Sequence, residues 1–259
     1  MAPLLSIEGV SKDFNVRGKQ VLALDTLSLA LEEGEFVTVV GPSGCGKSTL
    51  LNLVVGLLAP SAGQILFRGQ AVAGINPEIG YVTQKDNLLP WRTLIDNVEL
   101  ALEIRGIEKS ARRRRAGELI ERVGLTGFEE HYPHELSGGM RQRANIIRTL
   151  IYDPELILMD EPFGPLDAQT RIVLQEQLLK LWLASKKTIL FITHDLVEAI
   201  TLADRVIVMT SRPGRVKHVA SVPIPRPRDV YQIHTSREFR DVYDTLWREL
   251  RPEVNMAEV

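Results

Sequence analysis

The feature that most constrains the fold of this chain is the segment GPSGCGKST at residues 41–49. It follows the apolar run 36–40 and precedes LLNLVVGLL, a stretch with helical character. A loop of the pattern GxxxxGK[ST] between a strand and a helix is the context that a phosphate-binding loop requires. An ordinary glycine-rich turn is the alternative. The bare pattern is expected by chance in roughly one chain of this length in a hundred, and the flanking strand and helix favour phosphate binding further.

The residue types of this loop suit an anion. Its glycines let backbone N–H groups turn inward, and the helix amino terminus adds partial positive charge. Lys47 would reach the terminal phosphates of a nucleotide, and the Ser48 hydroxyl could bind magnesium. Cys45 is interpreted as a spacer whose N–H serves the phosphates. The predicted nucleotide-binding residues of the loop are Gly41, Pro42, Ser43, Gly44, Cys45, Gly46, Lys47, Ser48 and Thr49.

The rest of the chain alternates short aliphatic runs with longer helix-like stretches, which predicts an α/β fold with a largely parallel sheet. Runs at 36–40, 157–159 and 188–193 are almost continuously apolar, as expected of strands buried on both faces. In parallel α/β sheets, ligands bind at the carboxyl ends of the strands. The polar residues after these three runs are therefore the first candidates for chemistry.

Two of the strands end in candidate catalytic residues. LILMDEP delivers Asp160, which could hold a metal ion, and Glu161, which could polarise an attacking water. FITHD ends at His194, whose neutral imidazole could bond the γ-phosphate or that water. Alone, the acidic pair would be a solvated turn and the histidine a structural residue. Beside a phosphate loop, the catalytic interpretation is favoured.

A further motif, HELSGGMRQRANIIRTL, places Ser137, Gly138 and Gly139 before a strongly helical run. Ser137 could cap this helix while the glycines leave its amino terminus open to a second anion. With the phosphate loop, the acidic pair and the histidine in this order, residues 5–215 resemble the ABC ATPase family, and LSGGM resembles its signature motif.

That resemblance implies a P-loop NTPase parallel core, an N-terminal antiparallel β subdomain and an inserted α-helical lobe, with ATP and Mg²⁺ as cofactors. It also implies that Glu161 is the general base, that His194 is the switch histidine and that Lys47 acts with them. Asp167 in PFGPLD resembles the acidic residue through which two subunits communicate. The other implied contacts are Phe14 on adenine, Ser137, Gly138, Gly139 and Met140 on nucleotide, and Ser48, Gln84 and Asp160 on metal.

Two residues depart from the family pattern. Met140 stands where glutamine is commoner, so a hydrogen bond from that side chain is lost. Pro165 stands where alanine is usual, and it removes a backbone N–H and stiffens its loop. Neither change removes a group expected to contact phosphate.

The expected organisation is one ABC ATPase domain in four segments. Residues 1–90 and 153–210 form the α/β core, charged and helix-favouring sequence over 91–152 forms the inserted lobe, and 211–259 is a C-terminal extension. In that extension, the prolines of RPGRVKHVASVPIPRPRD are expected to break regular structure, and 236–250 is expected to form an amphipathic helix. The extension is expected to behave as an appendage.

Composition indicates where in the cell the protein is expected. With 31 basic and 33 acidic residues, the chain has no global positive field for nucleic acid, and one cysteine fits a reducing cytosol. Its amino terminus lacks the features of a secretory signal, and its most apolar stretch, 50–59, is too short to cross a bilayer. We therefore expect a peripheral protein at the cytoplasmic face of the inner membrane, with other chains spanning it.

Within the family, QKDNLLPWRTLIDNV, KLW and SRPGRV resemble the ATPase subunits of importers for nitrate, sulfonate, taurine and related oxyanions. The implied partners are a second ATPase subunit, transmembrane permease subunits and, indirectly, an extracytoplasmic binding protein, and no nucleic acid is expected. Leu89 and Trp91 could contact a permease or pack the local core, with the two alternatives left open. The run 112–115 of four arginines is interpreted as the solvated face of a helix.

Two other functions remain as alternatives. A soluble ABC ATPase that acts on DNA or ribosomes would typically carry a long coiled coil or two fused nucleotide-binding domains, and the sequence shows one set of motifs without a long heptad array. A small-molecule kinase or regulatory nucleotide-binding module would explain the phosphate loop. It would leave LSGGM without a purpose.

Overall fold

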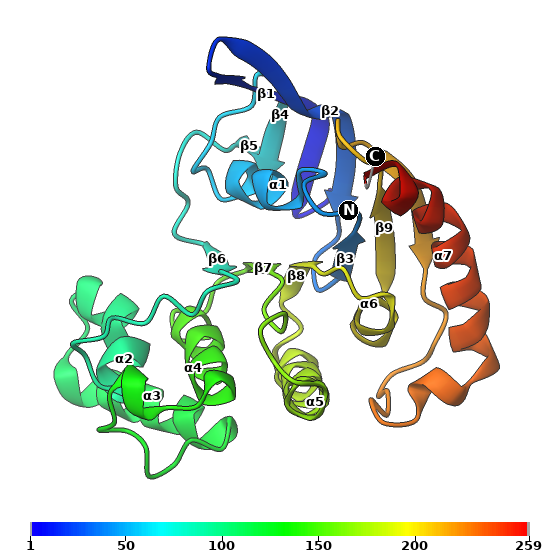
Figure 1. Ribbon diagram of the computed structural model, residues 1–259. Coiled ribbons are helices and arrows are strands. Elements are labelled where there is room, and N and C mark those ends of the chain that lie inside the picture. The colour runs from blue at the N-terminus through cyan, green and yellow to red at the C-terminus, as the bar shows by residue number, and fades with distance from the viewer. Residues whose placement is uncertain (1, 258–259) are drawn as a thin grey trace.

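The structure is a computed structural model that describes residues 2–257. Its strands are β1 (Leu5–Val16), β2 (Lys19–Leu31), β3 (Phe36–Val40), β4 (Ala62–Phe67), β5 (Gln70–Ala71), β6 (Ile79–Val82), β7 (Leu156–Asp160), β8 (Thr188–Ile192), β9 (Arg205–Met209) and β10 (Val216–Ser221). Its α-helices are α1 (Lys47–Val54), α2 (Leu94–Ile104), α3 (Lys109–Arg122), α4 (Gly138–Leu150), α5 (Ala168–Ser185), α6 (Leu196–Leu202) and α7 (Arg237–Ala257). Figure 1 shows their arrangement.

A six-stranded sheet forms the centre of the fold, in the order β10-β9-β3-β8-β7-β6. The strands from β9 to β6 are parallel, and β10 joins the edge antiparallel to β9. Every residue of β3 and of β8 is buried, as expected of strands covered on both faces. The predicted α/β class with a parallel core is confirmed.

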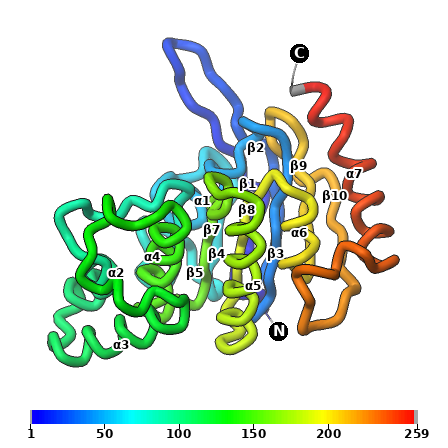
Figure 2. The backbone as a smooth tube through the Cα atoms, turned by 60° about the horizontal axis from the view of Figure 1, so that its bottom comes forward, coloured from blue at the N-terminus to red at the C-terminus, as the bar shows by residue number. Residues whose placement is uncertain are grey.

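A second sheet is antiparallel, in the order β2-β1-β4-β5. β1 and β2 form a long hairpin whose tip projects from the body of the molecule, as the blue loop at the top of the tube shows (Figure 2). The base of the hairpin buries Leu5, Ile7, Leu29 and Leu31 against the phosphate-loop side of the fold. This sheet confirms the N-terminal antiparallel β subdomain.

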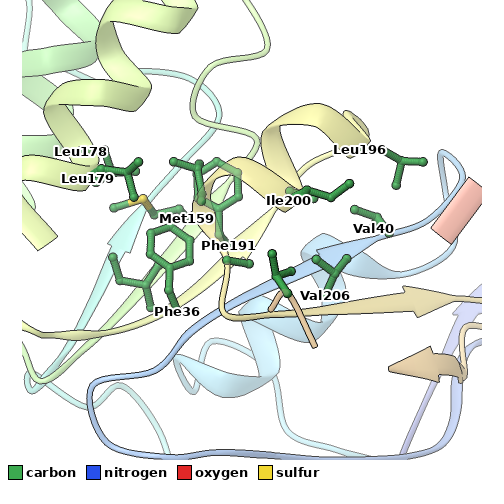
Figure 3. Packing of buried hydrophobic residues seen from close by; sticks show 14 of the residues in the cluster. Phe36, Val40, Met159, Leu178, Leu179, Phe191, Leu196, Ile200 and Val206 are labelled. Atoms are coloured by element: carbon green, nitrogen blue, oxygen red, sulfur yellow. The ribbon is translucent and has the colours of Figure 1, made fainter. Parts of the chain in front are cut away.

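The main core lies between the central sheet and α5, α6 and α7. Phe36, Met159 and Phe191 meet there beneath Leu178 and Leu179 of α5 (Figure 3). The rings of Phe36 and Phe191 lie 5.9 Å apart between centroids, and both side chains are fully buried. Each buried aromatic ring contributes about 2 kcal/mol through removal of apolar surface from water.

Helices α2, α3 and α4 lie between β6 and β7 in the sequence and enclose a core of their own, with Leu94, Val98 and Ile147 at its centre. In Figure 1 they extend to one side of the central sheet.

The arginine run of α3 is only partly the solvated face that the sequence suggested. Arg112 and Arg113 reach across to Glu99 of α2, which is 2% exposed, at 3.1 and 3.5 Å. Arg114 and Arg115 are exposed. The prediction failed for the first two because a buried carboxylate on the neighbouring helix needs a paired charge, and sequence spacing alone does not show that neighbour.

The segment after β9 was expected to be irregular, and this was wrong for residues 216–221. They form β10, which pairs with β9 from Val216 opposite Met209 to Ser221 opposite Arg205. The prolines of the segment, Pro213, Pro223, Pro225 and Pro227, all lie outside that strand. An edge strand needs only one partner, so the flanking prolines do not prevent pairing.

The final helix is longer than predicted and is no loose appendage. α7 continues through Pro252 to Ala257, beyond the expected end at residue 250. Its apolar face buries Phe239, Val242, Leu246 and Leu250 in the main core. It contacts β9 and β10 along the edge of the central sheet (Figures 1 and 2). Within residues 2–257, no helix is both long enough and apolar enough to cross a bilayer.

Candidate nucleotide-binding site

The phosphate loop joins the carboxyl end of β3 to α1, as predicted. Gly46, which caps α1, has a φ of 104°, and Gly44 has a φ of 75°, both in the left-handed region that favours glycine. A Cβ atom on Gly46 would also lie 2.7 Å from the Leu24 side chain. The side chain of Lys47 is buried, and its Nζ atom donates to the carbonyl oxygens of Gly41 and Pro42 at 2.8 and 3.0 Å.

A cavity of about 470 Å³ opens beside this loop. Its apolar end is lined by residues of the hairpin, and its polar end by the phosphate loop and the strand ends. The lining residues are Phe14, Val16, Val21, Ala23, Ser43, Gly44, Gly46, Lys47, Ser48, Thr49, Gln84, Asp160, Glu161 and Arg212. One cavity therefore offers an apolar surface for a planar base and hydrogen-bond donors with positive charge for phosphates.

Three predicted residues of the loop do not line the cavity. Gly41 and Pro42 hold the ammonium of Lys47 through their carbonyl oxygens. The Cys45 side chain points into the core under the loop, and burial raises the pKa of its thiol. This position fits the interpretation of Cys45 as a spacer, because a buried thiol with a raised pKa is unreactive.

Asp160 lies at the end of β7, at the polar end of the cavity. Burial raises the pKa of this carboxyl, and hydrogen bonds from Ser48 and Tyr81 partly oppose that rise. The Tyr81 hydroxyl lies 3.5 Å from Asp160 Oδ2, and burial, together with the charge of Asp160, raises the pKa of the phenol. Sequence analysis had not identified Tyr81, because it lies inside β6 and not at its end.

The adjacent Glu161 has an unusual backbone. Its φ is 43°, which non-glycine residues rarely adopt, and its N–H donates to the carbonyl oxygen of Ile192 at 3.0 Å. Its Oε2 atom lies 3.1 Å from Nδ1 of His194, whose side chain is 59% exposed. Strain of this kind persists only where the surroundings enforce it, and it concentrates at functional sites. The two predicted catalytic groups therefore contact each other, and of the two only Glu161 lines the cavity.

The signature segment lies elsewhere. Ser137 caps α4 by accepting a hydrogen bond from the Met140 N–H at 3.2 Å. A Cβ atom on Gly139 would lie 2.8 Å from the Thr170 side chain, so glycine is needed where α4 meets α5. Ser137, Gly138, Gly139 and Met140 do not line the phosphate-loop cavity of the described chain. The fold therefore does not bring the signature to the nucleotide cavity of the same chain.

Gln84 also lines a second depression of about 650 Å³, which Gly138 and Pro165 line as well. The segment after Gln84 is held by α4. Arg141 pairs with Asp86 at 3.0 Å, and Arg148 donates to the Asp86 and Asn87 carbonyl oxygens. The segment that follows Gln84 is therefore in direct contact with α4, the helix that carries the signature.

Tyr81 contacts Asp160 but does not line the cavity, whereas four residues that do line it had not been predicted. Val21 lies directly opposite Phe14 in the hairpin register, so Val16, Val21 and Ala23 could have been found by pairing the two runs around Arg17 and Gly18. Arg212 follows β9, which lies beside β3 in the sheet. The strand-end rule, applied to β9 as well, would have pointed to it.

Comparison with known proteins decides the family. The family model described as ABC transporter matches residues 24–164, a span that contains the phosphate loop, the signature segment and the acidic pair. This chain belongs to the ABC transporter family. It is an ABC-type ATPase, a protein that binds and hydrolyses ATP.

Similar proteins include an uncharacterized ABC transporter ATP-binding protein of Methanocaldococcus jannaschii, 48% identical over 96% of this chain and 92% of its own length. An aliphatic sulfonates import ATP-binding protein of Bacillus cereus is 42% identical over 92% of each chain. A taurine import ATP-binding protein of Yersinia pestis is 47% identical over 82% of each. Among solved structures, a dimeric ATP-binding cassette in a post-hydrolysis state with ADP and Pi has a TM-score of 0.76 and 32% identity, covering 85% of this chain and 100% of that one.

Proposed function

We propose that this ABC ATPase powers the import of a small oxyanion, such as a sulfonate, taurine or nitrate, through separate membrane subunits. The observation that carries the proposal is the gathering of Lys47, Asp160 and Glu161 at the polar end of one cavity, with the signature segment outside it. The three cavity residues are of the types that catalyse phosphoryl transfer. The signature segment outside the cavity is available to contact a nucleotide bound to a second subunit.

The chemistry assigned to the cavity is hydrolysis of the ATP γ-phosphate. A water oxygen bonds to the γ-phosphorus while the bond to the β–γ bridging oxygen breaks, releasing ADP and phosphate. Glu161 takes the proton of that water, and its contact with His194 fixes the direction of the carboxylate. Lys47 turns from the Gly41 and Pro42 carbonyls to the phosphates, where it neutralises charge.

The residues present also fit a magnesium ion. Ser48 and Asp160 supply the hard oxygen ligands that Mg²⁺ prefers, and Gln84 lines the same cavity. The described residues contain no group of three or more His, Cys, Asp or Glu that could hold a metal, so the protein would give few ligands and phosphates the rest. Bound there, the ion would offset the negative charge that develops on the phosphates.

The working form assigned to the chain is a pair. One nucleotide in the cavity is not reached by the Ser137–Gly139 segment of the same chain, so that segment would meet the nucleotide of a partner subunit. The similar cassette that was solved with ADP and Pi is dimeric, which supports a head-to-tail arrangement of two copies or of one copy and a related chain.

Trp91 supports a permease contact. Its side chain is 71% exposed at the start of the helical lobe, so packing in the local core, one of the two alternatives that the sequence left open, does not explain it. Leu89 beside it is half-buried. An exposed tryptophan is a suitable contact for a membrane subunit, and the α4 helix of the same lobe lines a depression together with Gln84. With a permease as partner, the proposed location of the chain is the cytoplasmic face of the membrane.

The cargo class rests on the sulfonate and taurine import proteins, which align with 92% and 82% of this chain. Uptake of labelled taurine, an alkanesulfonate and nitrate, compared between source cells with the parental chain and cells with Glu161→Gln, tests it. We expect uptake of one of these anions to fall to background while glucose uptake is unchanged. Unaltered uptake of all three would refute the cargo class, and recovery of the protein with ribosomes or DNA would favour the alternative ABC function.

A further inference from the structure

The loop between β9 and β10, residues 210–215, is closed by its own hydrogen bonds. The Thr210 N–H donates to the Arg215 carbonyl oxygen at 3.0 Å, and the Thr210 hydroxyl donates to the Pro213 carbonyl oxygen at 2.9 Å. The Arg215 N–H returns a bond to that hydroxyl at 3.0 Å. These bonds join the two ends of the loop, and we call residues 210–215 the platform loop.

This loop is wedged between the hairpin and the phosphate loop. The Gly214 N–H donates to the Ala23 carbonyl oxygen at 2.9 Å, and the Asp25 N–H donates to the Gly214 carbonyl oxygen at 3.0 Å. A Cβ atom on Gly214 would lie only 2.1 Å from the Cys45 carbonyl oxygen, so only glycine allows this approach. The loop is thus in direct contact with the segment that binds phosphate.

Arg212 extends from the platform loop into the nucleotide cavity, where it lines the wall with Ser43 and Gly44. One guanidinium nitrogen, Nη2, donates to the Gly44 carbonyl oxygen at 3.2 Å. A guanidinium has five N–H donors in a planar fork, so most of them remain for a ligand in the cavity. Lys47 bonds to different carbonyl oxygens of the phosphate loop, those of Gly41 and Pro42. The two cations, Lys47 and Arg212, therefore lie at different positions around the phosphate loop.

We propose that Arg212 is a further nucleotide-binding residue, which contacts the phosphate chain of ATP and ADP, and that Glu253 of α7 is its positioning residue. The phosphates are the part of a nucleotide that suits an arginine beside Gly44, because a guanidinium binds phosphate through paired, charge-assisted hydrogen bonds. The apolar end of the cavity, at Phe14, is left for the base.

Glu253 supplies the link from the C-terminal helix. Its carboxylate is buried and accepts hydrogen bonds from the Ser211 N–H at 2.8 Å and the Ser211 hydroxyl at 3.2 Å. Lys217 on β10 pairs with its other oxygen at 2.9 Å. Burial raises the pKa of this carboxyl, but the bonds from Lys217 and Ser211 outweigh burial and hold the pKa below its ordinary value. The residue before Arg212 is therefore anchored by a charged group of α7.

The first test measures ATP and ADP affinity by calorimetry for four variants. Arg212→Ala and Arg212→Gln should weaken both nucleotides about three- to tenfold, as expected for loss of a charged contact that is partly screened by water. Arg212→Lys should keep most of the affinity because it keeps the charge. Arg215→Ala is the matched control, since Arg215 lies in the same loop but pairs with Asp25 and does not line the cavity.

Two results would overturn the phosphate contact. If Arg212→Gln binds ATP with the parental affinity, an uncharged side chain at this position is sufficient for binding, and the guanidinium charge does not contact the nucleotide. An equal loss in Arg215→Ala would mean that the effect reflects folding of the loop alone. Dependence of affinity on salt adds a second readout, because Arg212→Ala should show a smaller loss of affinity between low and high salt than the parent.

The positioning role of Glu253 is tested by a double-mutant cycle. Glu253→Ala should weaken ATP severalfold in the parental chain and much less in the Arg212→Ala background, because the arginine it positions is then absent. Equal losses in both backgrounds would refute the link, even if Glu253→Ala lowers stability, because a general structural effect does not depend on Arg212. Unchanged affinity in Glu253→Ala would refute it as well.

Discussion

The Nδ1 atom of His194 and the Oε2 atom of Glu161 lie 3.1 Å apart, although 33 positions separate these residues in the sequence. The contact joins the ends of β7 and β8, which are neighbours in the central sheet. One of the two residues, Glu161, has its backbone in the left-handed region. The histidine therefore holds in one direction the Glu161 carboxylate, which we assign as general base and which lines the phosphate-loop cavity.

Replacement of Glu161 tests that assignment. Glu161→Gln should keep ATP affinity within about twofold and lower the hydrolysis rate about 10²- to 10⁴-fold, because an amide fills the space but cannot take a proton from water. A phosphate-release assay with purified protein measures it. Hydrolysis near the parental rate, with Lys47→Ala inactive in the same assay, would show that another group is the base.

Phe14 should bind the adenine base. It is half-buried at the apolar end of the cavity, opposite Val21, and lies outside the three hydrophobic cores of the described chain. Phe14→Ala should raise the dissociation constant for ATP about tenfold, as for loss of base stacking, while Phe14→Trp preserves it. Pyrophosphate, which has no base, should bind both variants equally. A thermal transition shifted strongly downward in Phe14→Ala would instead indicate a packing role.

Glu198 on α6 should make stability depend on pH. Burial raises the pKa of this carboxyl to about 7, while hydrogen bonds from Thr193 and Gln175 oppose the rise. The folded state thus favours the protonated form, and the stability this provides is complete below about pH 4.5 and is lost as pH rises through about 7.

The variant that tests this is Glu198→Gln, which keeps the shape and a partner for Gln175 but never ionises. In urea unfolding at pH 8 it should be more stable than the parent by up to about 3 kcal/mol, and near pH 5 by less than about 1 kcal/mol. Glu176→Gln, at a half-buried position of α5 where the carboxylate pairs with Lys180, should show no such gain at pH 8. An equal gain for Glu198→Gln at both pH values would contradict the raised pKa.

The sequence predicted most of the cavity because its motifs are local. Residues 41–49, Asp160, Glu161 and His194 follow strands whose apolar runs are visible in the chain, so their meeting at one sheet edge follows from parallel topology. Arg212 was missed because the strand-end rule was not applied to β9, and Tyr81 was missed because it lies inside β6 and meets Asp160 only through a tertiary contact. The pairing of Arg112 with buried Glu99, and of Ser211 with Glu253, likewise depends on which helix or strand packs alongside.

The central claim is that each ATP site is completed by the signature segment of a second copy, and mixing two inactive variants tests it most directly. Lys47→Ala removes a phosphate contact, and Ser137→Arg blocks the signature, so neither should hydrolyse ATP alone. A mixed dimer holds one site with intact Lys47 and an intact partner Ser137. An equimolar mixture should regain about a quarter of the parental activity, since half of randomly formed dimers are mixed and each has one complete site of two. If crosslinking shows mixed dimers and the mixture stays inactive, or if Ser137→Arg alone hydrolyses ATP at the parental rate, the claim of a shared site is wrong.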